Sequence, residues 1–490
     1  MKVCADRITE REAAGKCRGE GKAESAVLLA ACLVFYLWLP VMDGYVWCKD
    51  SLSYTTMDIS REPLYPTFLA LLRALPFPWG EDGYLYAAVV LQSLLAAYTA
   101  WRLGLAAARI AGGVQKDPCS GRARLVSRMM MAAGAASQWM IVILTRFIAQ
   151  RGSSYQESIM TEGLGLSLYV LFLLQLWRWH EEGKKRNLLL TVCMLVILIS
   201  LRKQLLVAGV LFALAAFVLD GLVRRAWRRF LYQMLAIILV MASVAGLDCA
   251  YNAAVRGVWM QHTGNSMGAL CTLLYISDEE DAARIEDETL REEFTAIWQE
   301  ADRQGLLMAD AGENPDWVML TTHYADSYDA IGYGILHPVL LERIDAEDPS
   351  RSDPERYQRL DEQEMEMRNA LLTAHPDRFF KLWVGNLRKG LVNSVARENT
   401  ILNWCALGLY AVYLGLSFYL LRFRRERAVR SVLLFAGLVL GGIVLNCVVV
   451  GAVIFPQPRY MIYSMGLFYT ALALLLHAAW KCRRTSPAWR

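Results

Sequence analysis

The feature that most constrains this chain is a series of long apolar blocks separated by short charged segments. The hydrocarbon core of a bilayer is about 30 Å thick, so a helix needs about 20 apolar residues to cross it. Hydrophobic residues make up 56% of the 490 residues. A soluble chain of that length would instead divide into several domains with alternating polar and apolar positions. The sequence therefore predicts an all-α polytopic membrane protein.

About ten of the blocks are predicted to be transmembrane helices. They are residues 25–42, 84–106, 129–145, 163–177, 188–201, 204–219, 230–249, 402–421, 431–450 and 461–480. A further block, 64–75, is too short to cross comfortably and contains Arg73. It is predicted to be an interfacial or re-entrant helix in the first outer loop.

The lysines and arginines of the short loops predict the orientation, because cytoplasmic loops of membrane proteins carry an excess of these residues. If the N-terminus is cytoplasmic, every connection on that side is basic: 109–128, 178–186, 224–229, 422–430 and the tail 481–490. We therefore expect a multi-pass protein of the plasma membrane with both termini in the cytoplasm.

Three domains follow from this topology. Residues 1–250 are expected to form an N-terminal transmembrane bundle, with its first outer loop at 43–83. Residues 251–400 are expected to be a small extracytoplasmic domain, helical and rich in loops, because helical patterning over 281–305 and 355–373 is interrupted by prolines. Residues 401–490 are expected to add the C-terminal transmembrane helices.

Charge and cysteine content exclude some classes of function. The net charge of +4 is too small to indicate nucleic-acid binding. The 11 cysteines are scattered, with no CxxC pair and no metal-ligand spacing. The sequence therefore predicts neither a disulfide framework nor a zinc site.

The first outer loop holds the densest set of candidate functional residues. Four acids, Asp43, Asp50, Asp58 and Glu62, lie there with several aromatic residues and Arg61. Low dielectric and nearby cations at a membrane surface shift carboxyl pKa values, as acid–base chemistry requires. The competing interpretation is a solvated loop in which these acids cap ordinary turns.

Further charged residues lie at the ends of predicted spans on the same side. Glu162 begins a span, where the helix macrodipole favours an acid by roughly 0.3–1 kcal/mol, but an ionisable residue near the bilayer is also a candidate site residue. The simplest role for Arg202, Lys203 and Arg459 is to reach the interface as snorkelling anchors. A fork-shaped guanidinium in that position also suits a lipid phosphate.

The segment Asp50-Ser-Leu-Ser-Tyr54, followed by Arg61-Glu62-Pro63-Leu64-Tyr65-Pro66, resembles the first outer loop of GT-C-type membrane glycosyltransferases. These enzymes use polyprenyl-phosphate-linked sugars and include the protein O-mannosyltransferases and the lipid A aminoarabinose transferases. Three further features match the family in order and together cover nearly the whole membrane part: Thr161-Glu162, the helix break Leu201-Arg202-Lys203-Gln204, and Pro458-Arg459-Tyr460.

The resemblance implies an inverting hexosyl- or pentosyltransferase that moves a sugar from a polyprenyl-phosphate donor to a glycan, lipid or protein acceptor at the outer face. A carboxylate acts as general base while the lipid phosphate leaves, so Asp50 is the first choice for the catalytic base and Asp58 the second. Cations stabilise the charge that grows on the phosphate. The implied substrate-binding residues are Tyr54, Arg61, Glu62, Tyr65, Glu162, Arg202, Lys203, Arg459 and Tyr460.

Members of this family often carry a paired Asp-Asp or Asp-Glu in the first loop, whereas Ser51 follows Asp50 here. No metal ligand is therefore assigned, and a divalent metal ion is left open as the one cofactor.

Two other classes compete with the transferase. A transporter or flippase of lipid-linked glycans would favour charges within spans and matching interrupted helices, but the spans are nearly free of ionisable residues. A polymerase or ligase of surface polysaccharide would rely on a large outer loop with essential arginine and histidine. His323 and His337 lie in such a loop, although isolated histidines there are usually solvated side chains.

Overall fold

The computed structural model describes residues 2–77, 80–114, 120–148, 153–397 and 400–485, and these are predominantly helical. Among them, the β-type pairing is confined to a single parallel bridge between Val46 and Ser158. The all-helical fold class predicted from the sequence is confirmed at this level.

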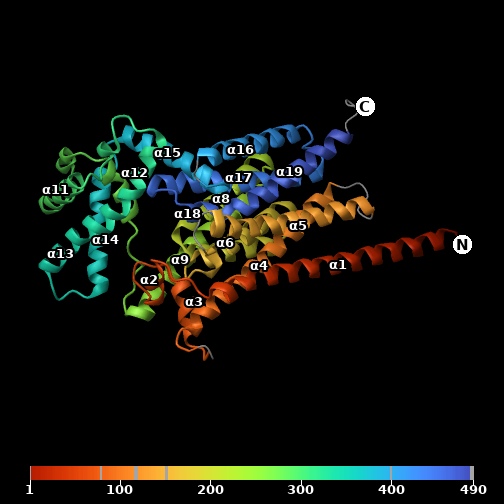
Figure 1. Ribbon diagram of the computed structural model, residues 1–490, viewed down its shortest axis with the longest axis horizontal. Helices are drawn as coiled ribbons and strands as arrows, with labels where there is room; N and C mark the ends of the chain where they lie inside the picture. The colour runs from red at the N-terminus through yellow and green to blue at the C-terminus, as the bar shows by residue number, and fades with distance from the viewer. Residues whose placement is uncertain (1, 78–79, 115–119, 149–152, 398–399, 486–490) are drawn as a thin grey trace.

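The molecule is elongated, with two distinct ends (Figure 1). At one end lie α11 (Glu288–Arg303), α13 (His337–Glu347) and α14 (Asp353–Leu371). At the other end, α1 (Lys2–Asp43) begins and α19 (Met465–Thr485) finishes. Both ends of the chain therefore lie away from the helices of the segment 251–400.

Seven helical stretches in the described part of the chain are long and apolar enough to cross a membrane. They are Lys22–Asp43, Gly83–Gly113, Lys203–Val223, Trp227–Arg256, Ile401–Leu421, Arg427–Val453 and Pro458–Arg484. This is the composition of a multi-pass membrane protein. The other three predicted spans are also helical, within α5 (Gly121–Ile143), α6 (Glu162–Glu182) and α7 (Lys185–Leu201), but they are shorter or more polar.

Close helix contacts in the bundle depend on glycine. Gly104 of α4 (Gly83–Gly113) and Gly134 of α5 face each other, and a Cβ built on Gly134 would lie 2.9 Å from the Cα of Gly104. Small residues let transmembrane helices approach at backbone distance and gain van der Waals contact. The crossing of α4 and α5 therefore requires glycine at both positions.

We expect Gly134→Ala to destabilise the protein by about 1–3 kcal/mol, because the added methyl group forces the two helix backbones apart. The measurement is denaturant unfolding of the purified protein in detergent. Gly437 of α17 (Arg427–Val453) is the matched control, since a Cβ there meets nothing within 4 Å. Gly437→Ala should leave stability unchanged or raise it by about 0.5–1 kcal/mol through helix propensity. Equal effects at the two positions would contradict the close crossing.

The helix pair around Arg202 is interrupted. Arg202 follows α7 in an extended conformation, with φ −162° and ψ 124°, before a short 3₁₀ turn and α8 (Leu206–Ala215). The interruption at Arg202-Lys203 that the sequence suggested is therefore a true break between two helices. It directs the Arg202 side chain towards the start of α6.

The helices α10 (Met267–Ile276), α11, α12 (Trp317–Asp329), α13 and α14 form what we call the cap, residues 267–371. Its own apolar core contains Leu270, Phe294, Tyr324, Leu340 and Met367. Side chains that bind free backbone N–H groups begin two of its helices, Asp287 at α11 and Asp316 at α12. The helical patterning predicted over 281–305 and 355–373 corresponds to α11 and α14.

The helix α15 (Pro376–Val395) joins the cap to the bundle. Trp383 Nε1 donates to Val448 O at 3.1 Å, and Asn386 Nδ2 donates to Gly451 O at 3.0 Å. Both acceptors belong to α17. One buried and one partly buried hydrogen bond therefore fix α15, the helix that follows the cap, to α17.

Candidate active site

A cavity of about 1140 Å³ lies where three parts of the chain meet. These are the segment between α1 and α3 (Leu64–Arg73), residues 44–63, which we call the first long loop, the start of α18 (Pro458–Met461), and the cap. Charges of both signs line it. Among the described lining residues, the cations are Lys49, Arg61, Arg397 and Arg459, and the acids are Asp50, Asp58 and Asp329. Residues that are hundreds of positions apart in the chain therefore share one space.

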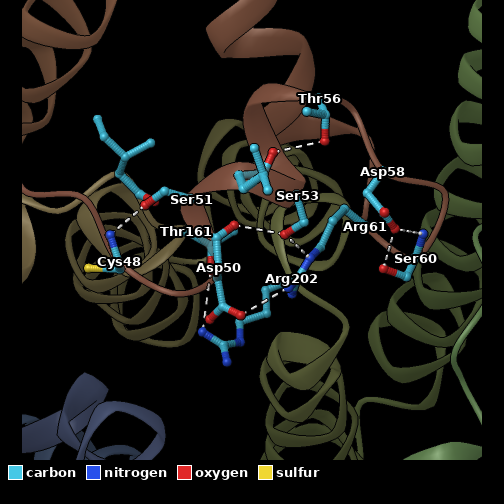
Figure 2. A network of polar contacts seen from close by, with 12 residues as sticks. Cys48, Asp50, Ser51, Ser53, Thr56, Asp58, Ser60, Arg61, Thr161 and Arg202 are labelled. Atoms are coloured by element: carbon cyan, nitrogen blue, oxygen red, sulfur yellow. Dashed lines mark hydrogen bonds and ion pairs between the residues drawn. The ribbon is translucent and has the colours of Figure 1, made fainter. Parts of the chain in front are cut away.

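The first long loop is held in place by the segment before α6. Val46 N donates to Glu157 O at 2.8 Å, and Ile159 N donates to Val46 O at 3.1 Å. Ser51 Oγ then donates to Ile159 O at 3.0 Å while accepting from Cys48 N at 2.8 Å, the latter bond drawn in Figure 2. These bonds fix the loop before it reaches the cavity.

Asp50 precedes α2 (Ser51–Thr55), and its carboxylate binds two arginines. Arg61 Nη2 donates to Oδ1 at 2.9 Å, and Arg459 Nη1 donates to Oδ2 at 2.6 Å. Ser53 Oγ accepts from Arg61 Nε at 2.8 Å and so orients that guanidinium (Figure 2). Burial favours the neutral acid, but the charges of Arg459 and Arg61 outweigh it and hold the pKa of Asp50 below its usual range. Asp50 is therefore ionised at neutral pH.

A second ion pair is linked to the first through an aromatic ring. Arg202 Nη1 binds the fully buried carboxylate of Glu162. It also donates to Thr161 Oγ1 at 3.3 Å (Figure 2). The Cζ atoms of Arg202 and Arg459 lie 4.7 and 4.9 Å from the centre of the Tyr460 ring. Tyr460 therefore contacts both guanidinium groups, one from each ion pair.

Asp58 lies on the cavity but is engaged in its own turn. Its Oδ1 accepts from Ser60 N at 2.9 Å and from Ser60 Oγ at 2.6 Å (Figure 2). Tyr54 is buried beneath Arg61, whose Cζ lies 4.8 Å from the ring centre. In the loop, the Asp50 carboxylate therefore binds two arginines, whereas the Asp58 carboxylate stabilises a turn.

The remaining predicted residues support the loop from outside the cavity lining. Tyr65 is buried, and its hydroxyl donates to Gln92 Oε1 at 2.8 Å. Glu62 accepts from the backbone of Lys203, whose ammonium group binds the Asn265 side chain. Of the eleven predicted residues, the cavity is lined by Asp50, Asp58, Arg61, Arg459 and Tyr460, whereas Tyr54, Glu62, Tyr65, Glu162, Arg202 and Lys203 surround these.

Residues that the sequence did not single out complete the site. Asp329, Tyr333 and Arg397 line the cavity from the cap and from the end of α15. Nothing in the sequence separates Asp329 from the many other acids of its segment. Gln92, in contrast, could have been found, because a polar residue inside an apolar span marks a position with a specific partner.

Two of the four histidines of the segment 251–400, His323 and His337, do not line the cavity. His337 Nε2 lies 2.8 Å from Glu364 Oε1, and His323 Nδ1 lies 3.0 Å from the Tyr275 hydroxyl. Both are half-buried, so the expectation that they are merely solvated side chains is wrong. Polar groups buried in the cap need hydrogen-bond partners, and these histidines supply them.

A divalent metal ion does not fit the residues around Asp50. Both carboxylate oxygens bind arginines. Throughout the part of the chain that the structure describes, no three or more His, Cys, Asp and Glu side chains gather in an arrangement that could hold a metal ion. The reaction proposed for this site therefore involves no metal ion.

No known protein family, curated protein or solved structure matches the chain. The resemblance of its motifs to the GT-C enzymes therefore stays an expectation. The case for a function rests on the residues of the cavity and their charges.

Proposed function

We propose that the protein is an inverting glycosyltransferase that takes a sugar from a polyprenyl-phosphate donor. The observation that carries the proposal is a carboxylate held by two arginines, Arg61 and Arg459, on the wall of a cavity of about 1140 Å³. This combination supplies both a phosphate-binding site and a base within one hydrogen bond of each other.

The arginines suit the phosphate of the donor. A guanidinium presents its N–H groups as a planar fork that matches phosphate oxygens. Arg459 has unused capacity, because its Nε is buried with no hydrogen-bond partner among the described residues. As negative charge grows on the departing phosphate, Arg459 and Arg61 stabilise it.

Donor binding also prepares Asp50 to act as a base. With both arginines bound to it, Asp50 is a weak base, because its pKa lies below the usual range. A phosphate that shares Arg459 and Arg61 removes part of that stabilisation and raises the pKa of the carboxyl. The base is therefore activated only when the donor is present.

The reaction is a single displacement. The acceptor oxygen forms a bond to the anomeric carbon as the bond from that carbon to the phosphate oxygen breaks. The electron pair of the broken bond leaves with the lipid phosphate, and the acceptor proton passes to Asp50. One displacement with one base inverts the configuration at the anomeric carbon.

The proposed reaction takes place on the outer face of the plasma membrane. We assign ten crossings, the seven apolar helices together with α5, α6 and α7; if the basic loops are cytoplasmic, the cavity then opens on the outer face. The start of α1 and the end of α19 both lie opposite the cap, which supports this arrangement (Figure 1).

The prenyl chain needs an apolar surface open to lipid, and α3 (Leu64–Arg73) offers one. This short helix buries Tyr65 and Leu69 against the loop and leaves Leu71 66% exposed. Most of the block predicted over 64–75 is helical, from Leu64 to Arg73, and we propose that this helix is interfacial and that its exposed side binds the prenyl chain. The loop would then hold the phosphate at Arg61 and the chain at α3.

The direct test is to incubate the purified full-length protein with polyprenyl-phosphate sugars and to measure released polyprenyl phosphate. We expect release with at least one hexosyl or pentosyl donor. Arg459→Lys should lower kcat/KM for the donor by roughly 10–100-fold, because a point charge replaces a bidentate hydrogen-bonding group.

The control is Arg388→Lys on α15, because Arg388 is exposed and lines a separate apolar cavity. It should leave donor turnover unchanged. If no donor releases lipid phosphate and reconstituted vesicles instead move one of the donors across the membrane, the protein is a flippase.

A further inference from the structure

The wall of the cavity that faces Asp50 comes from the cap, and it carries an acid with no partner. Asp329 lines the cavity and is exposed. The other two acids of the lining are engaged, Asp50 by two arginines and Asp58 by Ser60. Asp329 has neither a hydrogen bond nor an ion pair to any described residue. It is therefore the acid of this lining that is free to bind a ligand.

The backbone around Asp329 explains why it faces the cavity. Asp329 is the last residue of α12, and a π-helical segment, η7 (Ala330–Leu336), follows it. Tyr328 and Ile331 on either side are buried in the cap core. π-Helical turns widen a helix, are rare, and frequently occur at functional sites. Here the irregular turn keeps Asp329 and Tyr333 on the cavity side while the apolar neighbours stay in the core.

Tyr333 lies beside Asp329 and completes this wall. Its side chain is 60% exposed, although it is large and apolar apart from its hydroxyl. Tyr333 and Asp329 of the cap line the same cavity as Asp50 and Arg61 of the loop, so the cap wall and the loop wall bound the space where transfer would occur. A ligand held at Asp329 and Tyr333 is therefore placed next to the donor site.

We infer that Asp329 and Tyr333 form a binding site for an uncharged, hydroxyl-rich acceptor, that is, a glycan. The inference rests on the proposed function and names its acceptor class. An ionised carboxylate is an acceptor of hydrogen bonds only, with two oxygens that match a pair of neighbouring hydroxyl groups. The exposed Tyr333 ring adds an amphipathic surface with an apolar face and a hydroxyl that can donate or accept.

Charge in the cavity disfavours charged acceptors. Lys49, Arg61, Arg397 and Arg459 line the same space, and these four cations disfavour the basic side chain of a peptide. An anionic acceptor would meet the unpaired Asp329 and would compete with the donor phosphate for the arginines. A neutral sugar meets neither penalty, and its hydroxyls satisfy Asp329.

The site is tested by binding, without any donor present. Methyl glycosides of common hexoses and pentoses are titrated, up to tens of millimolar, against the purified full-length protein in detergent, and binding is followed by saturation-transfer NMR. We expect at least one glycoside to bind, with Asp329→Asn weakening it by roughly tenfold or more through loss of charge-assisted hydrogen bonds. Tyr333→Ala should weaken it as well.

Asp326→Asn is the matched control, because Asp326 is an exposed acid of the same helix that does not line the cavity. It should bind the glycoside as the wild type does. A short serine-containing peptide is the second probe. The inference is overturned if no glycoside binds, if Asp329→Asn binds as well as Asp326→Asn does, or if the peptide binds in an Asp329-dependent manner and the glycosides do not.

This experiment separates the inference from the proposed function. Glycoside binding that depends on Asp329, in a protein that releases no lipid phosphate from any donor, supports the glycan site and rejects the transferase. Donor turnover combined with glycoside binding that does not depend on Asp329 supports the transferase and rejects the glycan site. Where both hold, Asp329→Asn should raise KM for the acceptor, whereas Asp326→Asn should leave it unchanged.

Discussion

Replacing Asp50 by asparagine should lower kcat for sugar transfer by roughly 10²–10⁴-fold, which is the usual contribution of a general base. The amide has nearly the same shape as the carboxylate, so the loop should keep its fold. It cannot accept the proton of the acceptor, however. Donor binding should persist or improve, because the amide no longer occupies Arg61 and Arg459 with a full negative charge. The measurements are kcat for transfer and Kd for the donor.

Asp58→Asn is the comparison that decides between the two acids of the loop. Among the described residues, the Asp58 side chain accepts hydrogen bonds only from Ser60, and an asparagine side-chain oxygen can accept the same bonds. We therefore expect a much smaller loss of kcat than with Asp50→Asn. Full activity of the Asp50→Asn protein would contradict the assignment of Asp50 as the base. Inactivity of the Asp58→Asn protein alone would assign that role to Asp58.

The second large effect concerns stability. Glu162→Gln leaves Arg202 charged and half-buried with no carboxylate partner, and we expect it to destabilise the protein by about 3–5 kcal/mol. Glu162 is fully buried and is the only carboxylate among the described residues that forms an ion pair with Arg202, so no other acid pairs with Arg202 once Glu162 is replaced. Denaturant unfolding in detergent provides the measurement.

The double substitution Glu162→Leu with Arg202→Met tests whether the instability comes from an unpaired arginine or from the absence of the ion pair itself. Apolar side chains of similar volume often replace a buried ion pair at little cost. Most of the stability should therefore return in the double variant. An exposed pair of the cap, Glu300 and Arg303, gives the control, since Glu300→Gln should cause no measurable change. A double variant as unstable as Glu162→Gln would contradict the ion-pair account.

Local sequence patterns were enough to predict many of the helices, although not α10, α12 and α13 of the cap. Apolar block length predicted a helix in each of the ten blocks, seven of which lie in stretches long and apolar enough to cross a membrane, and the block at 64–75 predicted α3, because burial and periodicity act within one segment. The helix break at Arg202 could be predicted for the same reason, since two consecutive cations cannot lie within an apolar helix without disrupting it. Whether a segment forms a helix depends mainly on residues close to it in the sequence.

The pairing of side chains in the site depends on distant neighbours and could be predicted only in part. Topology placed Asp50 and Arg459 on one side of the membrane, but the rotation of each helix about its own axis decides that these two bind each other. The same reasoning could not distinguish Asp58, which a serine two residues later engages, from Asp50. Asp329 lay beyond reach, because its exposure to the cavity follows from an irregular turn that leaves no mark in the residue pattern.

The ion pair between Asp50 and Arg459 has a consequence for how the protein is made. The two residues are 409 positions apart. At about 5–20 residues per second, synthesis of that stretch takes roughly 20–80 s. For all of that time the nascent chain has the Asp50 carboxylate without the guanidinium of Arg459, which precedes the last helix. An unfinished chain therefore lacks half of the proposed phosphate site, which is complete only after the final helix has been synthesised.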